Sequence, residues 1–278
     1  MKLAIVLLAL CFLFLPWSGF TQHAKINKAQ KVKAEAKMLP EVGAYVGIST
    51  YAGDLTERSF EPLESNISVG LFYRKPFTKR FSLRANAFWG QISGNDARNS
   101  VESGLWQRNL RFETDVFEAS AQVEYRPFVL ESEFYQFSPY AFAGLGAFYF
   151  NPKTEVNGVK YSLQAYRTEG VEYSLFQYCI PFGVGMKVAV NNRGSIGGEV
   201  GWRKTFTDHL DDVSTNYPTN IAELAEINST AFMLSYRGGA VDPEAPLVPS
   251  PGSGRGNPER KDWYMFFGLT VGFYLGQD

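Results

Sequence analysis

The segment from Thr205 to Ser214 holds the residues whose types and spacing come nearest to a chemical site. Asp208, Asp211 and Asp212 supply carboxylate oxygens, which calcium prefers as ligands, and His209 lies between them. However, the Asp-x-Asp-x-Asp-Gly spacing of a calcium loop is absent, and acidic residues at the start of a loop also serve as turns and caps. We therefore favour a structural role for the three carboxylates, with a metal site as the alternative.

The sequence does not indicate an enzyme. His209 with its neighbouring carboxylates is the only candidate for acid-base chemistry of the kind used by lipid-modifying enzymes, and no Gly-x-Ser-x-Gly nucleophile turn accompanies it. Beyond residue 22, Cys179 is the only cysteine, and His23 and His209 are the only histidines. An intrachain disulfide and a histidine-rich metal site are thereby excluded. We predict a non-enzymatic protein without a cofactor.

The N-terminus predicts export. Met1-Lys2 precedes an apolar run from Leu3 to Leu15, and small and polar residues follow up to Gln22, as in a secretory signal. The apolar run is shorter than the roughly 20 residues that a transmembrane helix needs. We predict a signal peptide at residues 1–22 and a basic, aromatic-free periplasmic tail at residues 23–40.

The composition favours an all-β protein. The chain has 278 residues, of which 45% are hydrophobic, 15% aromatic and 20% charged, and it contains 26 Gly, 23 Phe and 15 Tyr. Strand formers are thus abundant. The formal net charge of -1 and the pI near 6.2 give no global basic field, so a nucleic-acid partner is not expected.

Apolar residues recur at every second position through most of the chain, which is typical of strands with two different faces. In Val116 to Arg126, for example, five apolar positions alternate with Glu118, Ser120, Gln122, Glu124 and Arg126. The pattern predicts eight strands, each long enough to cross a membrane when tilted. The predicted strands are Val42 to Ala52, Asn66 to Lys75, Phe81 to Ser93, Val116 to Arg126, Phe137 to Phe150, Ser174 to Val190, Ser195 to Phe206 and Trp263 to Leu275.

The links between these strands alternate between long and short. Outer-membrane barrels have short periplasmic turns and long external loops, and an even strand count returns both termini to the periplasm. Residues 41–278 are therefore predicted to form an all-β, eight-stranded antiparallel transmembrane barrel of a bacterial outer membrane, with outer-membrane lipids around it. Its long external loops include one at residues 207–261.

A soluble β-sandwich or lipocalin-like barrel is the structural alternative, because its strands also alternate but turn their apolar face inward. Two features favour the membrane barrel. The second face of the strands is rich in Gly, Ser, Gln, Glu and Arg, which suits a narrow hydrogen-bonded lumen. Aromatic residues also cluster near strand ends, as at Tyr149 with Phe150, Trp202 with Phe206, and Trp263 with Tyr274, which is typical of interfacial girdles.

The charged residues of the second face are predicted to point into a lumen that side chains just fill. We favour a salt-bridged plug over proton or ion conduction. The predicted lumen charge network is Arg84, Glu118, Glu124, Arg126, Glu199 and Arg203.

Within residues 207–261, a short helix is predicted around Ile221 to Ala225, and an apolar run follows at Ala231 to Tyr236. The run indicates either docking to a protein partner or folding back over the barrel mouth.

The chain resembles the PorG-type outer-membrane proteins of Bacteroidota, and the matching segments run in order through the mature chain. They are Val42 to Leu55 with its Tyr51-Ala52-Gly53-Asp54-Leu55 end, Gly90 to Asp96, Arg108-Asn109-Leu110-Arg111-Phe112 leading into Phe117-Glu118-Ala119, Phe150-Asn151-Pro152-Lys153, Ile180-Pro181-Phe182-Gly183-Val184-Gly185, Arg203 to Ser214, and Asp262-Trp263-Tyr264.

This resemblance implies a non-enzymatic component of the type IX secretion and gliding machinery, which contacts a periplasmic ring formed by a lipoprotein and its partner. The alternative is a general outer-membrane barrel that binds a surface ligand or partner through its external loops.

Overall fold

The computed structural model describes residues 38–56, 64–100, 102, 105–131, 135–190, 193–223, 228–240 and 248–276. The predicted signal peptide, and the predicted tail up to residue 37, lie outside these residues. No helix in the described ranges is long and apolar enough to cross a membrane.

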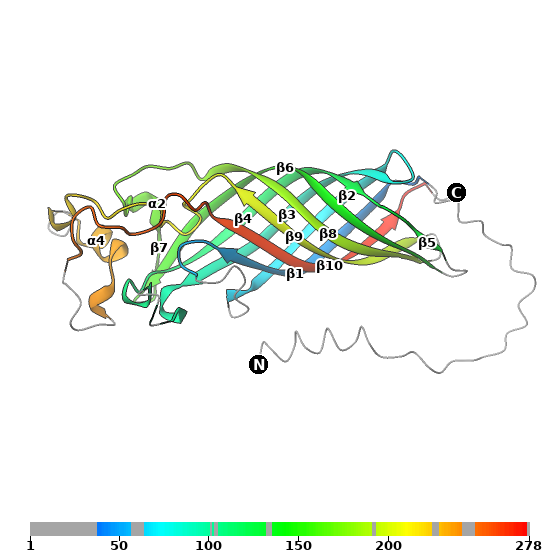
Figure 1. Ribbon diagram of the computed structural model, residues 1–278. Helices are drawn as coiled ribbons and strands as arrows, with labels where there is room; N and C mark the ends of the chain where they lie inside the picture. Colours follow the sequence, from blue (N-terminus) through cyan, green and yellow to red (C-terminus); the bar gives the residue numbers. More distant parts are fainter. Residues whose placement is uncertain are drawn as a thin grey trace, which may run out of the picture. The chain divides into compact units, whose positions relative to one another are not determined.

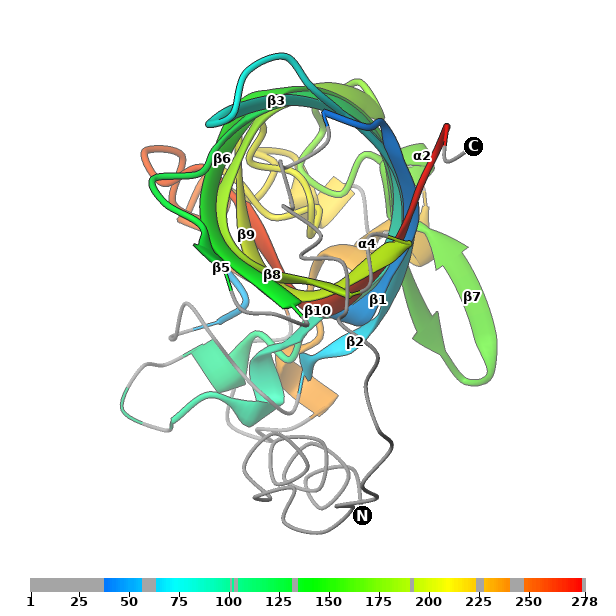
Figure 2. The same cartoon turned by 90° about the vertical axis from the view of Figure 1, so that its right-hand side faces the viewer.

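Eight long antiparallel strands of the described chain close into a barrel (Figures 1 and 2). Each pairs with the next along the chain, and the last pairs with the first from Glu41↔Tyr274 to Ala52↔Trp263. This confirms the predicted all-β, eight-stranded antiparallel barrel. The strands are β1 (Glu41–Ala52), β2 (Asn66–Pro76), β3 (Phe81–Asn95), β4 (Arg111–Tyr125), β6 (Tyr135–Val156), β8 (Phe176–Val190), β9 (Gly194–Thr205) and β10 (Trp263–Tyr274).

Short and long connections lie at opposite ends of the barrel. The turn end comprises residues 76–80, 126–131 and 193, together with the adjoining strand ends, and includes the short strand β5 (Leu130–Glu131). The loop end comprises the described residues of 53–65, 96–110, 157–175 and 206–262, and carries the labels β7, α2 and α4 in Figure 1. The alternation of short and long links that the sequence predicted is therefore present.

The outward face of the barrel is apolar. Because side chains alternate across a strand, every strand of the ring turns one set of residues away from the lumen. The following side chains, one from each strand in ring order, are 52–73% exposed: Val46, Leu71, Leu83, Phe117, Leu145, Val184, Ile196 and Leu269. A soluble barrel would place this face inward, so the structure has the opposite polarity.

The inward face changes character along the barrel axis. Towards the loop end it is an apolar core that includes Tyr51, Phe112, Phe150 and Phe148, and this core continues into the loops through residues such as Leu234. Towards the turn end the interior is lined by charged groups. Large rings that point into the lumen need small residues beside them. Gly268 is an example, because a Cβ added there would lie 2.1 Å from the Tyr45 ring.

Two strands extend well beyond the bounds that the alternation predicts. β4 begins at Arg111 rather than Val116, and β6 continues beyond Phe150 to Val156, where it turns back to pair with β7 (Val159–Ser162). The turn is Asn157-Gly158, with φ values of 53° and 78°. Asn-Gly favours this two-residue hairpin turn, because both positions need positive φ.

Residues 207–261, where described, fold back against the barrel mouth. Ile221 to Glu223 are helical, while the rest of the predicted helix at Leu224 and Ala225 lies outside the described residues. The predicted apolar run forms α4 (Ser229–Ser235), capped by the Asn228 side chain. Leu234 of this helix is buried in the core cluster. Of the two predicted alternatives, the structure therefore shows the run folded back over the barrel mouth. In the described chain, η5 (Gly238–Ala240) also lies in this range, and the other loops carry η2 (Asp96–Arg98), η4 (Leu105–Gln107) and α2 (Leu163–Tyr166).

The aromatic residues near strand ends do not all face outward. Phe150 is fully buried in the core, because it occupies an inward position of β6, so its assignment to an interfacial girdle is wrong. Outward rings do gather near the loop end, where Phe182 lies 5.9 Å from Trp202 and 6.0 Å from Trp263, centroid to centroid.

Candidate functional site

Two arginines link three carboxylates inside the turn half of the barrel. Arg74 donates to Glu41 at 2.7 Å and to Glu124 at 2.6 Å. Arg84 lies 3.1 Å from the second oxygen of Glu124 and donates to Glu199 at 2.5 Å. These side chains are at most 3% exposed. Each cation contacts two carboxylates, so the charges compensate one another with little access to water.

Further donors complete the shells of these carboxylates. Lys187 donates to Glu41 at 3.0 Å, Ser195 also donates to Glu41, and Tyr140 donates to Glu199 at 2.7 Å. These donors come from β6, β8 and β9. The network therefore ties strands from across the ring to one another.

A separate ion pair lies nearer the middle of the barrel. Arg203 donates from Nε to Glu118 at 2.8 Å, and Tyr264 donates its hydroxyl to the same carboxylate oxygen at 2.8 Å. The Arg203 guanidinium also lies 4.0 Å from the Phe266 ring centroid, which places a cation over an aromatic face.

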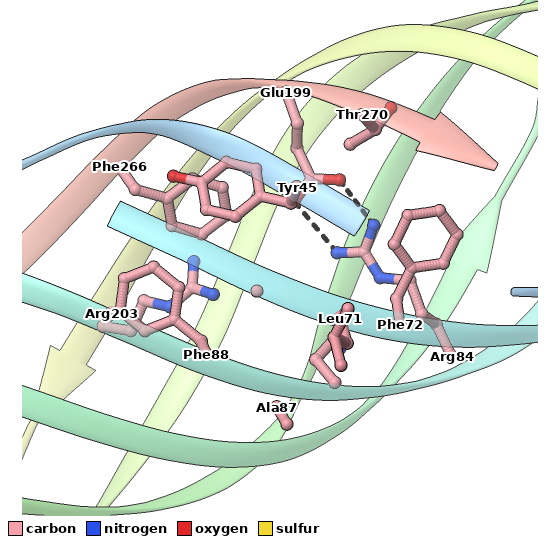
Figure 3. A pocket seen from close by; sticks show the side chains of 12 residues that line it. Tyr45, Leu71, Phe72, Arg84, Ala87, Phe88, Glu199, Arg203, Phe266 and Thr270 are labelled. Carbon is pink, nitrogen blue, oxygen red and sulfur yellow. Dashed lines mark hydrogen bonds and ion pairs between the residues drawn. The ribbon is translucent and has the colours of Figure 1, made fainter. Parts of the chain in front are cut away.

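A small cavity separates the two groups of charges (Figure 3). It measures about 20 Å³ and is lined by Arg84, Glu199 and Arg203 among others. The Nη1 atom of Arg203 is buried without a hydrogen-bond partner in the described chain. A space of this size accommodates about one water molecule, so the cavity suits a bridging water rather than an organic ligand.

The structure brings five of the six predicted lumen residues into these two ion-pair groups: Arg84, Glu118, Glu124, Glu199 and Arg203. Arg126 differs, because it follows the last residue of β4 and lies at the turn end. It donates to Ser82 Oγ at 3.3 Å and forms no ion pair within the described chain.

Glu41, Arg74 and Lys187 were not among the predicted network residues. The alternation of apolar and polar residues already indicated that Arg74 and Lys187 face inward. Lys187 falls on the small or polar face of its strand, and Arg74 is out of phase with the exposed Leu71 and Tyr73 of β2. Counting every strand by parity, including its first and last residues, would have found them.

The three carboxylates that were the alternative metal candidates are buried at the loop end with separate partners. Asp208 accepts from Ser214 at 2.8 Å, and Asp211 accepts from Tyr51 at 2.5 Å. Asp212 accepts from the Tyr173 hydroxyl at 2.7 Å.

Burial has a common effect on these carboxyls. It raises the pKa of Asp208 and of Asp212 to about 6 each, and holds the pKa of Asp211 well above its usual range.

Around His209, the described residues show neither a cluster of metal ligands nor an acid-base partner for the imidazole. No group of three or more His, Cys, Asp or Glu side chains is placed to hold a metal ion within the described residues. The His209 ring stacks on Tyr173 with centroids 4.3 Å apart, and burial lowers its pKa. In the described chain the imidazole has no hydrogen bond to a neighbouring carboxylate.

A cluster of hydrogen-bonded residues that are far apart in the sequence holds the loop end together. The Tyr51 hydroxyl contacts Asp211 at 2.5 Å and Asp262 at 3.2 Å. The other carboxylate oxygen of Asp262 accepts from the Leu210 amide at 2.9 Å. Burial and the neighbouring Asp211 hold the pKa of Asp262 well above its usual range.

Two arginines, the buried Arg255 and the partly buried Arg108, join the loops around this cluster. Arg108 donates to Asp96 at 2.8 Å and to the Asp54 carbonyl at 2.7 Å. Arg255 donates to Glu169 at 2.9 Å, and its own carbonyl accepts from Arg108. Four separate loops are thereby joined into one cap.

A protein-family model described as "Domain of unknown function (DUF6089)" matches residues 25–234. The chain belongs to this family. The match includes β1 to β9 and the first part of the cap, so most of the residues described above fall within the DUF6089 domain. No curated protein matches the chain.

Several solved structures resemble this DUF6089 chain. The attachment invasion locus protein Ail of Yersinia pestis has 10% identity and a TM-score of 0.37, covering 84% of this chain and 96% of Ail. Neisserial surface protein A has 9% identity and a TM-score of 0.40, covering 85% and 97%. The outer membrane protein OprG of Pseudomonas aeruginosa has 11% identity and a TM-score of 0.39, also covering 85% and 97%. Such likeness assigns no function to the chain.

Proposed function

We propose that this protein is a non-enzymatic outer-membrane barrel with a closed interior, which serves as a membrane-anchored scaffold. The observation that carries the proposal is the polarity of the wall. Every strand of the barrel exposes apolar side chains outward, while ion pairs and aromatic rings fill the inside. Hydrocarbon around the wall would make this arrangement favourable, whereas water would not.

The turn end faces the periplasm and the loop end faces outward in this proposal. Both ends of the barrel sequence, at Glu41 and Tyr274, lie on the turn side. An exported chain whose termini stay in the periplasm would be oriented this way.

The finer proposal is that the protein contributes to type IX secretion by contacting the periplasmic ring lipoprotein and its partner. Its support is the resemblance to PorG-type proteins. Tyr51, Asp96, Arg108, Asp211 and Asp262 all belong to those segments, and all take part in the bonds that hold the cap. The resemblance thus concerns residues that shape the same part of the fold.

A pull-down in mild detergent tests the secretion role. A tagged copy is extracted from outer membranes that contain intact rings, washed with salt, and the retained proteins are identified by mass spectrometry. Recovery of the ring lipoprotein and its partner is expected. Recovery of the barrel alone would remove the secretion role, whereas recovery of a surface partner would favour binding through the external loops. A tagged unrelated eight-stranded barrel serves as the control.

The non-enzymatic part of the proposal has its own test. His209→Ala should leave the export of secreted cargo and the recovery of the periplasmic ring proteins unchanged. The reason is that the His209 imidazole stacks on Tyr173 and has no acid-base partner in the described chain. If the variant still folds and still co-purifies with the periplasmic ring proteins but no longer supports export, that result would argue for chemistry at His209.

A further inference from the structure

Four cations at the turn end are exposed and lack carboxylate partners. Lys75, Lys79, Arg80 and Arg193 are all exposed, and none forms an ion pair within the described chain. Glu131 is the one exposed carboxylate among the described turn-end residues. Among the described residues of this rim, four exposed cations therefore face one exposed carboxylate.

Several exposed cations at the loop end have carboxylate partners. Arg98 pairs with Glu64 at 2.5 Å, and Arg167 pairs with Glu172 at 3.0 Å. Lys153 with Asp115, and Lys160 with Glu113, form further pairs. Other exposed cations of the loop end form no ion pair within the described residues, namely Arg111, Lys204 and Arg260. The four paired cations therefore provide a matched comparison for the unpaired cations of the turn end.

The turn-end cations lie beside outward aromatic rings. Phe81 stacks 6.1 Å from Phe77 and lies 5.1 Å from Tyr125, centroid to centroid, on the outer surface. The amides of Phe77 and Thr78 both donate to the Phe81 carbonyl, which fixes the turn that carries Lys79 and Arg80. Aromatic rings at a membrane boundary mark the level of lipid headgroups.

Arg193 repeats this arrangement at another position on the rim. Its carbonyl accepts from the Tyr274 amide, and the next residue, Gly194, is opposite the exposed Phe273. In the ring, the β8–β9 turn is separated from the β2–β3 turn by β10 and β1. The cation-and-ring pattern therefore occurs at separate places around the barrel.

We propose that the turn end binds the phosphate groups of anionic phospholipids through Lys75, Lys79, Arg80 and Arg193. This inference rests on the proposed membrane barrel. Long basic side chains at the apolar boundary reach headgroup phosphates while their stems stay against acyl chains. Lipids surround a barrel on all sides, which fits cations on separate turns better than a single acidic protein does.

The test measures which phospholipids stay bound. The mature chain is reconstituted into vesicles with equal phosphatidylglycerol and phosphatidylcholine, and flotation first establishes insertion. The protein is then extracted in neutral detergent, and native mass spectrometry quantifies the retained lipids. The test variant combines Lys75→Gln, Lys79→Gln, Arg80→Gln and Arg193→Gln. The matched control removes the same charge at the loop end, through Arg98→Gln, Lys153→Gln, Lys160→Gln and Arg167→Gln.

Phosphatidylglycerol should be enriched on the native protein and on the loop-end control, and the turn-end variant should lose about tenfold of that enrichment. A charge-preserving exchange of lysine and arginine at the same four positions should retain it, which separates charge from folding.

Three results would overturn the inference. They are equal retention of the two lipids by the native protein, unchanged enrichment in the turn-end variant, and displacement of the bound lipid by inorganic phosphate. Loss of co-purifying ring proteins with unchanged lipid retention would likewise overturn it in favour of an acidic protein partner. A chain that fails to float with vesicles contradicts the membrane proposal itself, which is a different outcome.

Discussion

Buried carboxylates in this protein have two kinds of surroundings. Inside the barrel, Glu118 and Glu199 each face an arginine, so their charge is compensated. At the loop end, Asp211 and Asp262 share the Tyr51 hydroxyl and have no ion pair in the described chain. Desolvation without a cation favours the neutral acid, and it raises the pKa of both of these carboxyls.

The stability of the loop end should decrease as the pH rises. The pKa of Asp208 is about 6 when folded, against an ordinary value of 3.8, so the folded state binds this proton more tightly than the unfolded state. Its contribution is therefore complete below about pH 4 and is lost as the pH rises through about 6. Lys261, 3.9 Å away, opposes the shift, while Asp54 and Glu169 reinforce it.

Asp208→Asn should weaken this pH dependence. Asparagine keeps an oxygen for the Ser214 hydroxyl but cannot titrate. Hydrogen exchange of residues 206–214, corrected for intrinsic rates, is compared at about pH 5 and about pH 7.5. The control is Asp115→Asn, at a half-exposed carboxylate on β4. Equal pH dependence in Asp208→Asn and the native protein would contradict the assignment.

Breaking the Arg203–Glu118 pair should destabilise the barrel strongly. Arg203→Met leaves a buried carboxylate facing Tyr264 alone, which costs about 3–5 kcal/mol of unfolding free energy. Adding Glu118→Gln removes that lone charge and should recover part of the loss. Denaturant unfolding in lipid vesicles, followed by tryptophan fluorescence, measures both. If the double variant were as unstable as the sum of the single changes, the pair would not be coupled.

At the scale of the element, the strands depend on small residues at inward positions where large rings cross the lumen. On β10, Gly268 faces the Tyr45 ring, whereas on the neighbouring β9 a Cβ at Gly198 would meet no atom closer than 3.9 Å. The two glycines are near neighbours in the sheet, because Gly198 pairs with Leu269. They differ in the face that they occupy.

Gly268→Ala should therefore destabilise the barrel, and Gly198→Ala should not. A methyl group at Gly268 forces Tyr45 to move, and overpacking of this kind typically costs about 1–3 kcal/mol. Heat-dependent mobility on gels and denaturant unfolding in vesicles report the difference. Equal stability of the two variants would show that the Tyr45 ring has room to shift.

At the scale of the whole molecule, the two ends of the barrel differ in both structure and charge. The loop end is a hydrogen-bonded cap in which several surface cations are paired, whereas the turn end is short and carries exposed cations beside outward aromatic rings. In the proposed membrane barrel, this difference between the two ends would set the direction of the barrel.

Thiol labelling of cells tests that direction. Beyond the predicted signal peptide the only cysteine is Cys179, which is 1% exposed, so background labelling should be low. Lys160→Cys, on the exposed β7 strand, should react with a membrane-impermeant reagent on intact cells. Glu131→Cys, at the turn end, should react only after the outer membrane is permeabilised. The reverse pattern would contradict the proposed orientation.

Much of the fold follows from the sequence, because the strand has a period of two. That period places Arg84, Glu118 and Glu199 on the inner face and Leu71 and Leu145 on the outer one, and the structure has them there. The link lengths likewise placed the loops at one end. The β6–β7 hairpin carried a local Asn157-Gly158 signal that the alternation alone did not reveal.

Only the tertiary structure decided which inward groups meet. Alternation states which face a side chain occupies but not its depth or its partner, so the Arg74 bridge between Glu41 and Glu124 required the register of three strands. In the sequence, the acidic segment around Asp211 suggested a metal site as an alternative, because the hydrogen-bond partner of Asp211, Tyr51, is distant in the chain. Tyr51 and Asp262 are 211 positions apart, and only packing of the loops over the closed barrel brings them together.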